Sequence, residues 1–366
     1  MLPSSGIALV WLLIAQVAPA PAAPPPVAAT FPYPATSEVK SAFLKQIDRP
    51  RVALDAKVES SSTDESGTRI ENVRFASEKK ADGTIERVPT LLVHPKEGKP
   101  GRRPAVIVLH GTGGNKEGTR DWLNALAKRG IIGVAIDARY HGERSGGAKG
   151  AEAYLVAITR AWRAKPGEPR EHPFYFDTCW DLGRTVDYLS SRDDVDPKRI
   201  GMLGISMGGI ETWLSAAVDD RVAVAVPAIS VQSFRWSLEN GQWQGRARTI
   251  GAAHQAAARD LGEPEVNERV CRALWNKVIP GILGPFDCPS MLRLFAGRPL
   301  LILNGDKDPN CPIGGTRVAI ASAREAYAKA GASDRLKVNI AEGVGHTVTP
   351  EQRREALDWL ERWLQP

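Results

Sequence analysis

The chain has 366 residues, of which 43% are hydrophobic and 25% are charged. This length allows one large enzyme-sized domain or two ordinary ones, and the composition excludes a mostly unstructured chain, a collagen-like chain and a small disulfide-rich protein. The 48 basic and 42 acidic residues give a net charge of +6. The basic residues are spread among acids, without a basic helix or interleaved aromatics, so we expect no nucleic-acid binding.

The start of the chain is uncharged, and its first charged residue is Glu38. Residues 7–15 form a continuous apolar run, which is too short for a membrane span of about 20 residues, so we expect no stable membrane insertion. Small residues and prolines follow, with Ala-Pro-Ala at 20–22. This order is typical of a secretory signal peptide, with a buried N-terminal helix as the alternative because no Lys or Arg precedes the run. We expect a signal peptide over 1–22, a Pro-rich linker over 23–37 and a secreted or periplasmic protein.

Strand-like and helix-like segments alternate through the rest of the chain. Short β-branched or apolar runs predict strands, and the stretches between them predict helices. The runs are continuous rather than alternating, as in strands that are buried on both faces. We therefore predict an α/β fold with a mostly parallel sheet that helices cover on both faces. In chain order the predicted strands are 87–93, 105–109, 131–136, 200–204, 222–226, 299–303 and 336–340, and the predicted helices are 123–128, 181–191, 208–217, 316–330 and 351–364.

Two long segments, 141–177 and 228–298, do not follow this period. Both contain Trp residues and are partly helical in pattern. We interpret them as insertions above the carboxyl ends of the strands, where ligand crevices form in open α/β sheets. The second would form a helical cap, in which Trp236 and Trp243 are candidate substrate contacts. A place in the core of the cap is the alternative for both rings.

The strongest local motif is Gly-Ile-Ser-Met-Gly at residues 204–208, between a predicted strand and a predicted helix. G-x-S-x-G in this setting places the serine on a tight, strained turn, where glycines on either side leave room for the backbone. The Ser206 hydroxyl then projects above the sheet at a helix N-terminus, whose partial positive charge favours a developing anion. We therefore predict Ser206 as a nucleophile.

A serine hydroxyl needs a neighbouring base to take its proton. Of the six histidines, only His254 and His346 follow Ser206, as the chain order of this class of hydrolase requires. His254 lies in a helical stretch of the second insertion, whereas His346 lies in a Gly-Val-Gly-His loop after a strand, so we predict His346 as the base. An acid should follow the intervening strand, where Asp306 and Asp308 are both candidates.

Residues 110–114, His-Gly-Thr-Gly-Gly, follow the first central strand and supply a candidate oxyanion hole. The predicted donors are the backbone N–H groups of Thr112 and of Met207, directly after the nucleophile. A phosphate-binding loop is the alternative, but neither G-K-[ST] nor G-x-G-x-x-G spacing is present.

The cysteines give no sign of a metal site, because they lack CxxC spacing and a nearby pair of histidines. We therefore expect no zinc site, and the predicted serine nucleophile and its base need neither a metal nor an organic cofactor. Two disulfides and four buried thiols are both compatible with the sequence. The four residues are Cys179, Cys271, Cys288 and Cys311.

The motifs together resemble the α/β-hydrolase superfamily, in the branch that holds dienelactone hydrolases, acetyl xylan esterases and prolyl oligopeptidase-like catalytic domains. They are HGTGG, then DARYHG at 137–142, GISMGG, NGDKDP at 304–309 and GVGH at 343–346. The resemblance covers about residues 70–366, and it implies an α/β-hydrolase fold for a catalytic domain over 38–366.

The resemblance also assigns roles within the motifs. It places the acid at Asp308, which leaves Asp306 as a turn residue that bonds its own backbone. It implies a structural role for His141. From the charges on either side of His141, we also expect an ion pair between Arg139 and Glu143.

The function that the motifs and the resemblance imply is a serine hydrolase that cleaves carboxylic esters through an acyl-enzyme intermediate. The implied substrate is a small-molecule ester with a small acyl group such as acetyl, carbohydrate esters included. A serine peptidase is one alternative, although residues 38–70 leave no room for the N-terminal propeller of size-selecting relatives. A catalytically inactive binding protein is another, although all three predicted catalytic residues are present. The sequence does not indicate the oligomeric state.

Overall fold

The computed structural model describes residues 33–365 except 66, 97–100 and 169–170. The predicted signal peptide and most of the predicted linker lie outside the described residues. Helix α1 (Thr36–Ile47) begins inside the stretch that we expected as linker, and it buries Val39, Phe43 and Ile47 along one face. In the described part of the chain, no helix is both long and apolar enough to cross a membrane.

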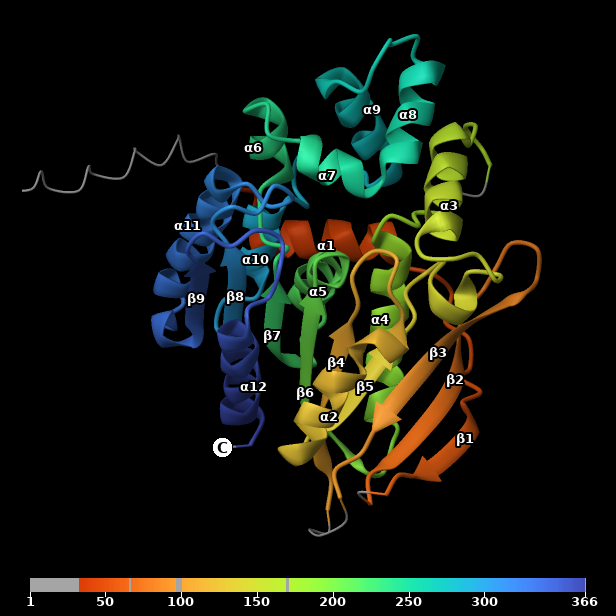
Figure 1. Cartoon of the computed structure of the whole chain (residues 1–366), viewed down its shortest axis with the longest axis vertical. Helices are drawn as coiled ribbons and strands as arrows, with labels where there is room; N and C mark the ends of the chain where they lie inside the picture. Colours follow the sequence, from red (N-terminus) through yellow and green to blue (C-terminus); the bar gives the residue numbers. More distant parts are fainter. Residues whose placement is uncertain (1–32, 66, 97–100, 169–170, 366) are drawn as a thin grey trace, which may run out of the picture. The chain divides into compact units, whose positions relative to one another are not determined.

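A nine-stranded sheet organises the chain, with the strand order β1-β2-β3-β5-β4-β6-β7-β8-β9 (Figure 1). The pairs β1–β2, β2–β3 and β3–β5 are antiparallel, and all other neighbours are parallel. The predicted mostly parallel sheet is therefore confirmed. The strands are β1 (Lys57–Thr63), β2 (Arg69–Lys79), β3 (Ile85–Val93), β4 (Arg103–Leu109), β5 (Ile132–Ile136), β6 (Val195–Ile205), β7 (Val222–Ala228), β8 (Leu300–Gly305) and β9 (Leu336–Ala341).

Helices cover both faces of the sheet, as predicted. In β4, Ala105 and Ile107 belong to one hydrophobic cluster, while Val106 and Val108 belong to the other, which shows that this central strand is buried on both sides. The first cluster packs against α1, α4 (Phe176–Ser190), α5 (Met207–Val218), α10 (Cys288–Leu294) and α11 (Ile313–Lys329). The second packs against α2 (Arg120–Lys128) and α12 (Pro350–Leu364).

Strands β1 and β2, the first two of the sheet, were not predicted, whereas β3 was. Strand β1 is exposed along its whole length, and its sequence Lys-Val-Glu-Ser-Ser-Ser-Thr has no apolar alternation. It is an edge strand that pairs only with β2. Its position depends on backbone hydrogen bonds rather than on a buried face, so the hydrophobic pattern gives no signal for it.

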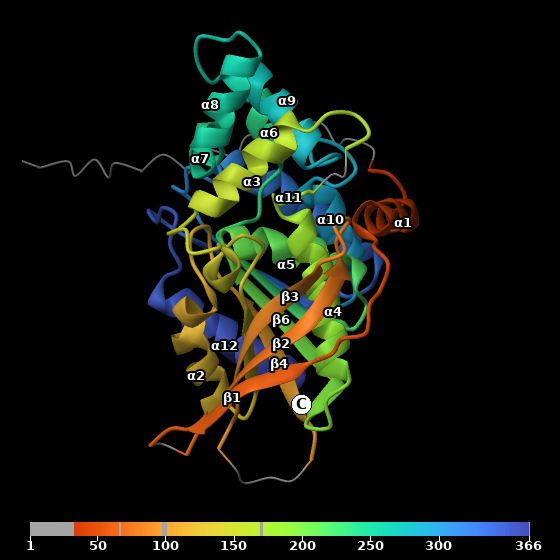
Figure 2. The same ribbon diagram turned by 90° about the vertical axis from the view of Figure 1, so that its right-hand side faces the viewer.

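The second insertion forms a helical cap beyond the sheet, together with α3 from the first insertion (Figures 1 and 2). Helix α3 packs against α8 and α9 within this cap. The cap helices are α3 (Glu152–Arg163), α6 (Phe234–Glu239), α7 (Gln244–Thr249), α8 (Gly251–Asp260) and α9 (Glu268–Val278). Outside the cap, three short 3-10 helices occur in the loops: η1 (Lys116–Thr119), η2 (Gly142–Arg144) and η3 (Ser333–Arg335).

Candidate active site

Ser206 lies on the turn between β6 and α5, with φ 57° and ψ −111°. This strained backbone is tolerated only where its surroundings hold it in place. The flanking glycines allow the turn, because a Cβ at Gly204 would lie 2.0 Å from the carbonyl oxygen of Gly208. A Cβ at Gly208 would lie 2.5 Å from the Cβ of Leu109. The motif is therefore packed too tightly for any side chain at either position.

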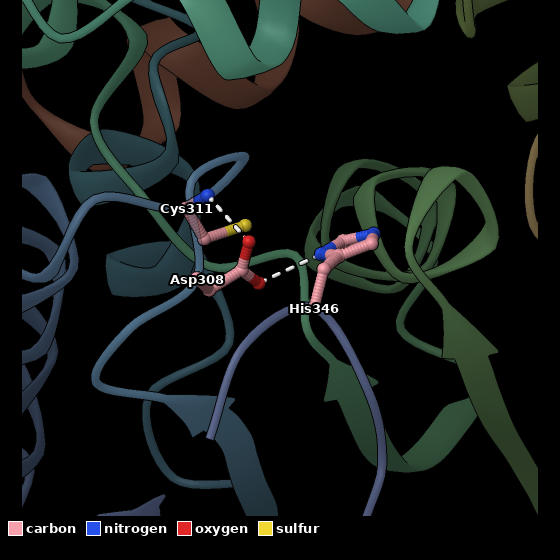
Figure 3. A group of neighbouring side chains, drawn as sticks. All are labelled: Asp308, Cys311 and His346. Carbon is pink, nitrogen blue, oxygen red and sulfur yellow. Dashed lines mark hydrogen bonds and ion pairs between the residues drawn. The ribbon is translucent and has the colours of Figure 1, made fainter. Parts of the chain in front are cut away.

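A chain of hydrogen bonds runs from Ser206 through His346 to Asp308. The His346 Nε2 is 2.8 Å from the Ser206 Oγ. The His346 Nδ1 is 2.7 Å from the Asp308 Oδ2, as Figure 3 shows for these two side chains. An ionised carboxylate only accepts hydrogen bonds, so Nδ1 donates to Asp308 and Nε2 is left to accept the Ser206 hydroxyl proton. The structure thus brings the predicted nucleophile, base and acid together.

Asp308 is held from its other side by the backbone. Its Oδ1 accepts hydrogen bonds from the N–H groups of Asn310 at 2.8 Å and Cys311 at 3.1 Å. The Asp308 side chain has no solvent exposure, whereas His346 is 23% exposed. The Asp308 carboxylate is therefore fixed in the interior, and the His346 imidazole is partly exposed to solvent.

The loop that carries Asp308 is bonded to the loop that carries His346. Lys307 N–H donates to the Val344 carbonyl at 2.9 Å. The Asp306 carboxylate accepts from the Gly343 N–H at 2.7 Å. Asp306 is thus a loop-bridging residue, and the predicted bond to its own turn is wrong.

The predicted oxyanion loop lies against the nucleophile. The Gly208 N–H donates to the His110 carbonyl at 3.1 Å, which joins residues 110–114 to the start of α5. The His110 ring braces the loop, because its Nδ1 donates to the Gly111 carbonyl at 2.8 Å and its Nε2 accepts from the Ala138 N–H at 3.2 Å. Burial lowers the pKa of His110, so the ring is neutral.

Two backbone N–H groups at this place are available to a ligand. Among the described residues, the N–H groups of Thr112 and Met207 donate to no other group. Met207 is the first residue of α5, where backbone N–H groups have no partner inside the helix. Both predicted donors are therefore free to bind an oxygen atom.

The Asp137 carboxylate joins the turn that follows the oxyanion loop to the turn at residues 142–144. It accepts from the backbone N–H groups of Lys116 at 2.8 Å and Glu143 at 3.0 Å, and it lies 3.3 Å from the Lys116 ammonium. Lys116 also pairs with Glu143. The expected partner of Glu143 was Arg139, and that expectation is wrong.

Arg139 instead bonds to the buried Asp181, with Nε 2.7 Å from Oδ2. Although burial alone would raise it, Arg139 and Arg144 hold the pKa of Asp181 well below its usual range. His141 donates from Nδ1 to the Arg139 carbonyl at 2.8 Å and packs on the Tyr154 ring. Burial lowers the pKa of His141 to about 4, which agrees with the structural role that the resemblance implies.

The cap contacts the loop of the candidate acid directly. A Cβ at Gly245 of α7 would lie 1.8 Å from the Pro309 carbonyl oxygen, so the helix touches this loop. The next residue, Arg246, is 2% exposed and donates from Nη2 to the Asn310 carbonyl at 3.1 Å. Arg246 could not be predicted, because nothing in the sequence Gly-Arg-Ala-Arg separates a buried arginine from an exposed one.

The other candidate base, His254, is part of the cap interior. Its Nδ1 faces the Ile250 carbonyl at 3.2 Å, and its Nε2 accepts from the Trp275 indole N–H at 3.1 Å. Both ring nitrogens are therefore used inside the cap.

The two predicted substrate contacts are half-buried. Trp236 lies against Gly314 and Gly315 at the start of α11, where a Cβ at Gly314 would lie 2.0 Å from the ring. Trp243 precedes α7 and packs against the hydrophobic core. A role in substrate binding stays a prediction for both.

All four cysteines are free and buried. Burial and the neighbouring Asp308 carboxylate raise the pKa of the Cys311 thiol well above its usual range. A protonated thiol is a weak nucleophile, so Cys311 does not compete with Ser206 for that role.

The acetyl xylan esterase (AXE1) family model matches residues 42–236. YtaP of Bacillus subtilis is 27% identical over 292 residues, which are 76% of this chain and 84% of YtaP. The acetyl xylan esterase from Paenibacillus sp. R4 superposes with a TM-score of 0.61 at 24% identity, over 89% of this chain and 92% of that one. Acetyl xylan esterase 1 from Thermoanaerobacterium sp. JW/SL YS485 gives 0.63 at 19% identity, over 90% and 94%. These likenesses confirm the α/β-hydrolase fold.

Proposed function

The chain belongs to the acetyl xylan esterase (AXE1) family and is a carboxylic ester hydrolase, and we propose that it works by a serine mechanism on esters of small acyl groups. The observation that carries the proposal is the hydrogen-bond chain from Ser206 through His346 to Asp308, at 2.8 and 2.7 Å. These three side chains come from three different loops. The Ser206 hydroxyl can donate to His346 Nε2, and His346 Nδ1 can donate to the Asp308 carboxylate.

In the first half of the reaction, the Ser206 Oγ attacks the ester carbonyl carbon while His346 Nε2 takes the hydroxyl proton. Asp308 stabilises the imidazolium and holds its tautomer, without taking the proton itself. The tetrahedral intermediate collapses when His346 passes that proton to the leaving alcohol oxygen. An acyl-enzyme on Ser206 remains.

In the second half, a water molecule takes the place of the alcohol. His346 removes its proton, the water oxygen attacks the acyl carbon, and the carboxylic acid leaves as Ser206 recovers its proton. In both halves the negative charge on the carbonyl oxygen faces the free N–H groups of Thr112 and Met207. Losing one such donor typically costs about 10²–10³ in rate.

For the substrate, we propose acetyl esters, with acetylated carbohydrates as the alcohol part. The support is the family, since its name and the two solved structures above refer to acetyl xylan esterases. A 4-O-methyl-glucuronoyl methylesterase of Neurospora crassa is a further relative, 24% identical over 49% of this chain and 44% of that protein. The names of these relatives all refer to esters of carbohydrates.

A substrate series tests this choice. We expect kcat/KM to be highest for acetylated xylo-oligosaccharides, to fall as the acyl chain of p-nitrophenyl esters lengthens from acetyl to octanoyl, and to be undetectable for peptide amides. A preference for long acyl chains would contradict the small-acyl proposal. Cleavage of peptide amides at a comparable rate would favour the peptidase instead.

We also propose export of the protein, on the basis of the apolar run and the Ala-Pro-Ala sequence at its start. Expression of the full chain in a bacterial host and N-terminal sequencing of the product test this. The expected mature protein begins at or just after residue 23 and lies outside the cytoplasm. An intact Met1 in the cytoplasm would contradict it.

A further inference from the structure

Cys311 adds a third metal-binding side chain to the Asp308–His346 pair. One ligand atom of each of the three residues lies within 4.8 Å of those of the other two. Figure 3 shows the Cys311 sulfur pointing toward the Asp308 carboxylate and the His346 ring. The ordinary hydrolysis scheme uses only two of these side chains. The Cys311 Sγ donates to the Ile229 carbonyl at 3.4 Å, and this hydrogen bond would be given up when the sulfur binds a metal.

A carboxylate oxygen, an imidazole nitrogen and a sulfur are the donor types that Zn²⁺ binds in proteins. Bond lengths of about 2.0–2.3 Å in a tetrahedral site place neighbouring ligand atoms about 3.5 Å apart. Shifts of about 1 Å in the side chains would therefore bring the three atoms into range. His346 is 23% exposed, so solvent gives the ion a way in and a water molecule for the fourth position.

Groups around the three side chains would hold them as metal ligands. The Asp308 Oδ1 is fixed by the N–H groups of Asn310 and Cys311. The Arg246 Nη2 lies 3.5 Å from the Cys311 Sγ and donates toward it. Such outer hydrogen bonds orient metal ligands, and an N–H donor stabilises a metal-bound thiolate. The positive charge of Arg246 opposes a cation, so we expect reversible rather than permanent binding.

We propose that Asp308, Cys311 and His346 form an inhibitory site for a thiophilic divalent cation such as Zn²⁺. The inhibitory effect rests on the serine mechanism proposed above. The Cys311 S–H bond breaks, its proton goes to solvent, and the sulfur electron pair forms the bond to the metal. The lone pair of His346 Nδ1 forms a second bond after its proton has moved through solvent to Nε2. One proton is released for each ion bound.

The inhibition follows from the tautomer of His346. A neutral imidazole with the metal on Nδ1 carries its hydrogen on Nε2. Nε2 then donates toward Ser206 and cannot take the hydroxyl proton. The nucleophile is not activated, although the fold and the oxyanion loop are unchanged.

The first experiment is a Zn²⁺ titration of p-nitrophenyl acetate hydrolysis, with each rate divided by that protein's own metal-free rate. We expect full inhibition of the wild type, recovery with EDTA, and a midpoint at least about tenfold higher for Cys311→Ala, which loses one of three ligands. Cys271→Ala, which removes an equally buried thiol from the cap, is the matched control and should keep the wild-type midpoint. Equal midpoints for Cys311→Ala and the wild type would overturn the proposal.

A second measurement does not depend on esterase activity. Co²⁺ added to the Ser206→Ala protein should produce the near-ultraviolet band of a thiolate bound to cobalt, and Cys311→Ala in the same background should abolish it. Absence of the band in Ser206→Ala would also overturn the metal site. The serine mechanism is tested separately by the esterase activity of Ser206→Ala. Full activity in this variant would contradict the serine mechanism, independently of the cobalt spectrum.

Discussion

Replacing Asp308 by Asn tests how the hydrogen-bond chain sets the direction of proton transfer. The Asp308 Oδ1 accepts from two backbone N–H groups, at 2.8 and 3.1 Å. The amide oxygen of Asn must keep this place, because an NH₂ group there would face two donors. The NH₂ group then points at His346 Nδ1, only 2.7 Å from the present carboxylate oxygen. Nδ1 is forced to accept, and the ring proton moves to Nε2.

In that tautomer His346 cannot take the proton of Ser206. The loss expected for a wrongly protonated base is about 10⁴ in kcat, or about 5 kcal/mol of transition-state stabilisation. Asp306→Asn is the matched control, two residues away in the same loop. Its amide oxygen can still accept from the Gly343 N–H, which lies 2.7 Å from the present carboxylate. We expect its kcat to stay within about threefold of the wild type, since a neutral hydrogen bond replaces a charged one.

The assay is steady-state hydrolysis of p-nitrophenyl acetate, with the thermal unfolding midpoint of each variant as the test of folding. A folded Asp308→Asn enzyme within tenfold of the wild-type kcat would refute the argument from the tautomer. So would an Asp306→Asn enzyme that loses as much activity as Asp308→Asn.

Three further outcomes follow from packing and charge. Gly204→Ala, whose Cβ would meet the Gly208 carbonyl oxygen at 2.0 Å, should lower the free energy of unfolding in urea by about 1–3 kcal/mol. His141 and His254 have pKa values lowered to about 4 by burial, so the unfolded chain binds more protons than the folded one between about pH 4 and 6.5. The free energy of unfolding should therefore decrease as the pH is lowered from about 6.5 to 4, by up to about 3 kcal/mol per histidine, and His254→Gln should make this dependence shallower. Arg246→Gln frees the acid loop from the cap and should lower kcat by about 10–100-fold, whereas Arg248→Gln, exposed on the same helix, should leave kcat unchanged.

Much of the central sheet could be predicted, because its strands are continuous apolar runs. Strands β4, β5 and β8 are buried along nearly their whole length, and each was predicted to within two residues at either end. Strand β1 and helix α1 could not be predicted in the same way. The first is polar and exposed, and the second follows a proline-rich stretch that hides its start.

The site residues could be predicted because their backbone requirements restrict the sequence around them. Ser206 needs glycines on both sides, and His346 follows a Gly-Val-Gly loop next to a strand end. The choice between Asp306 and Asp308 depended on resemblance, and the structure shows why the residues alone left it open. Both carboxylates bond to the same loop, one to the Gly343 backbone and one to the His346 ring.

The contacts between the cap and the site could not be predicted. Arg246 approaches the loop of the candidate acid, and the Cys311 thiol within it, through long-range packing of α7 on the loop after β8. No periodicity or spacing in the sequence records which cap residue meets that loop. The side chains around the triad therefore become visible only in three dimensions.

The most direct test of the serine mechanism is to trap the acyl-enzyme. Wild-type protein mixed with excess p-nitrophenyl acetate and quenched in acid within one turnover should gain one acetyl group, on the peptide that contains Ser206. The same peptide should react with a fluorophosphonate probe, and Ser206→Ala should lose both modifications and its turnover while remaining folded. Acetyl transfer to another residue, or turnover that persists in folded Ser206→Ala, would contradict the account.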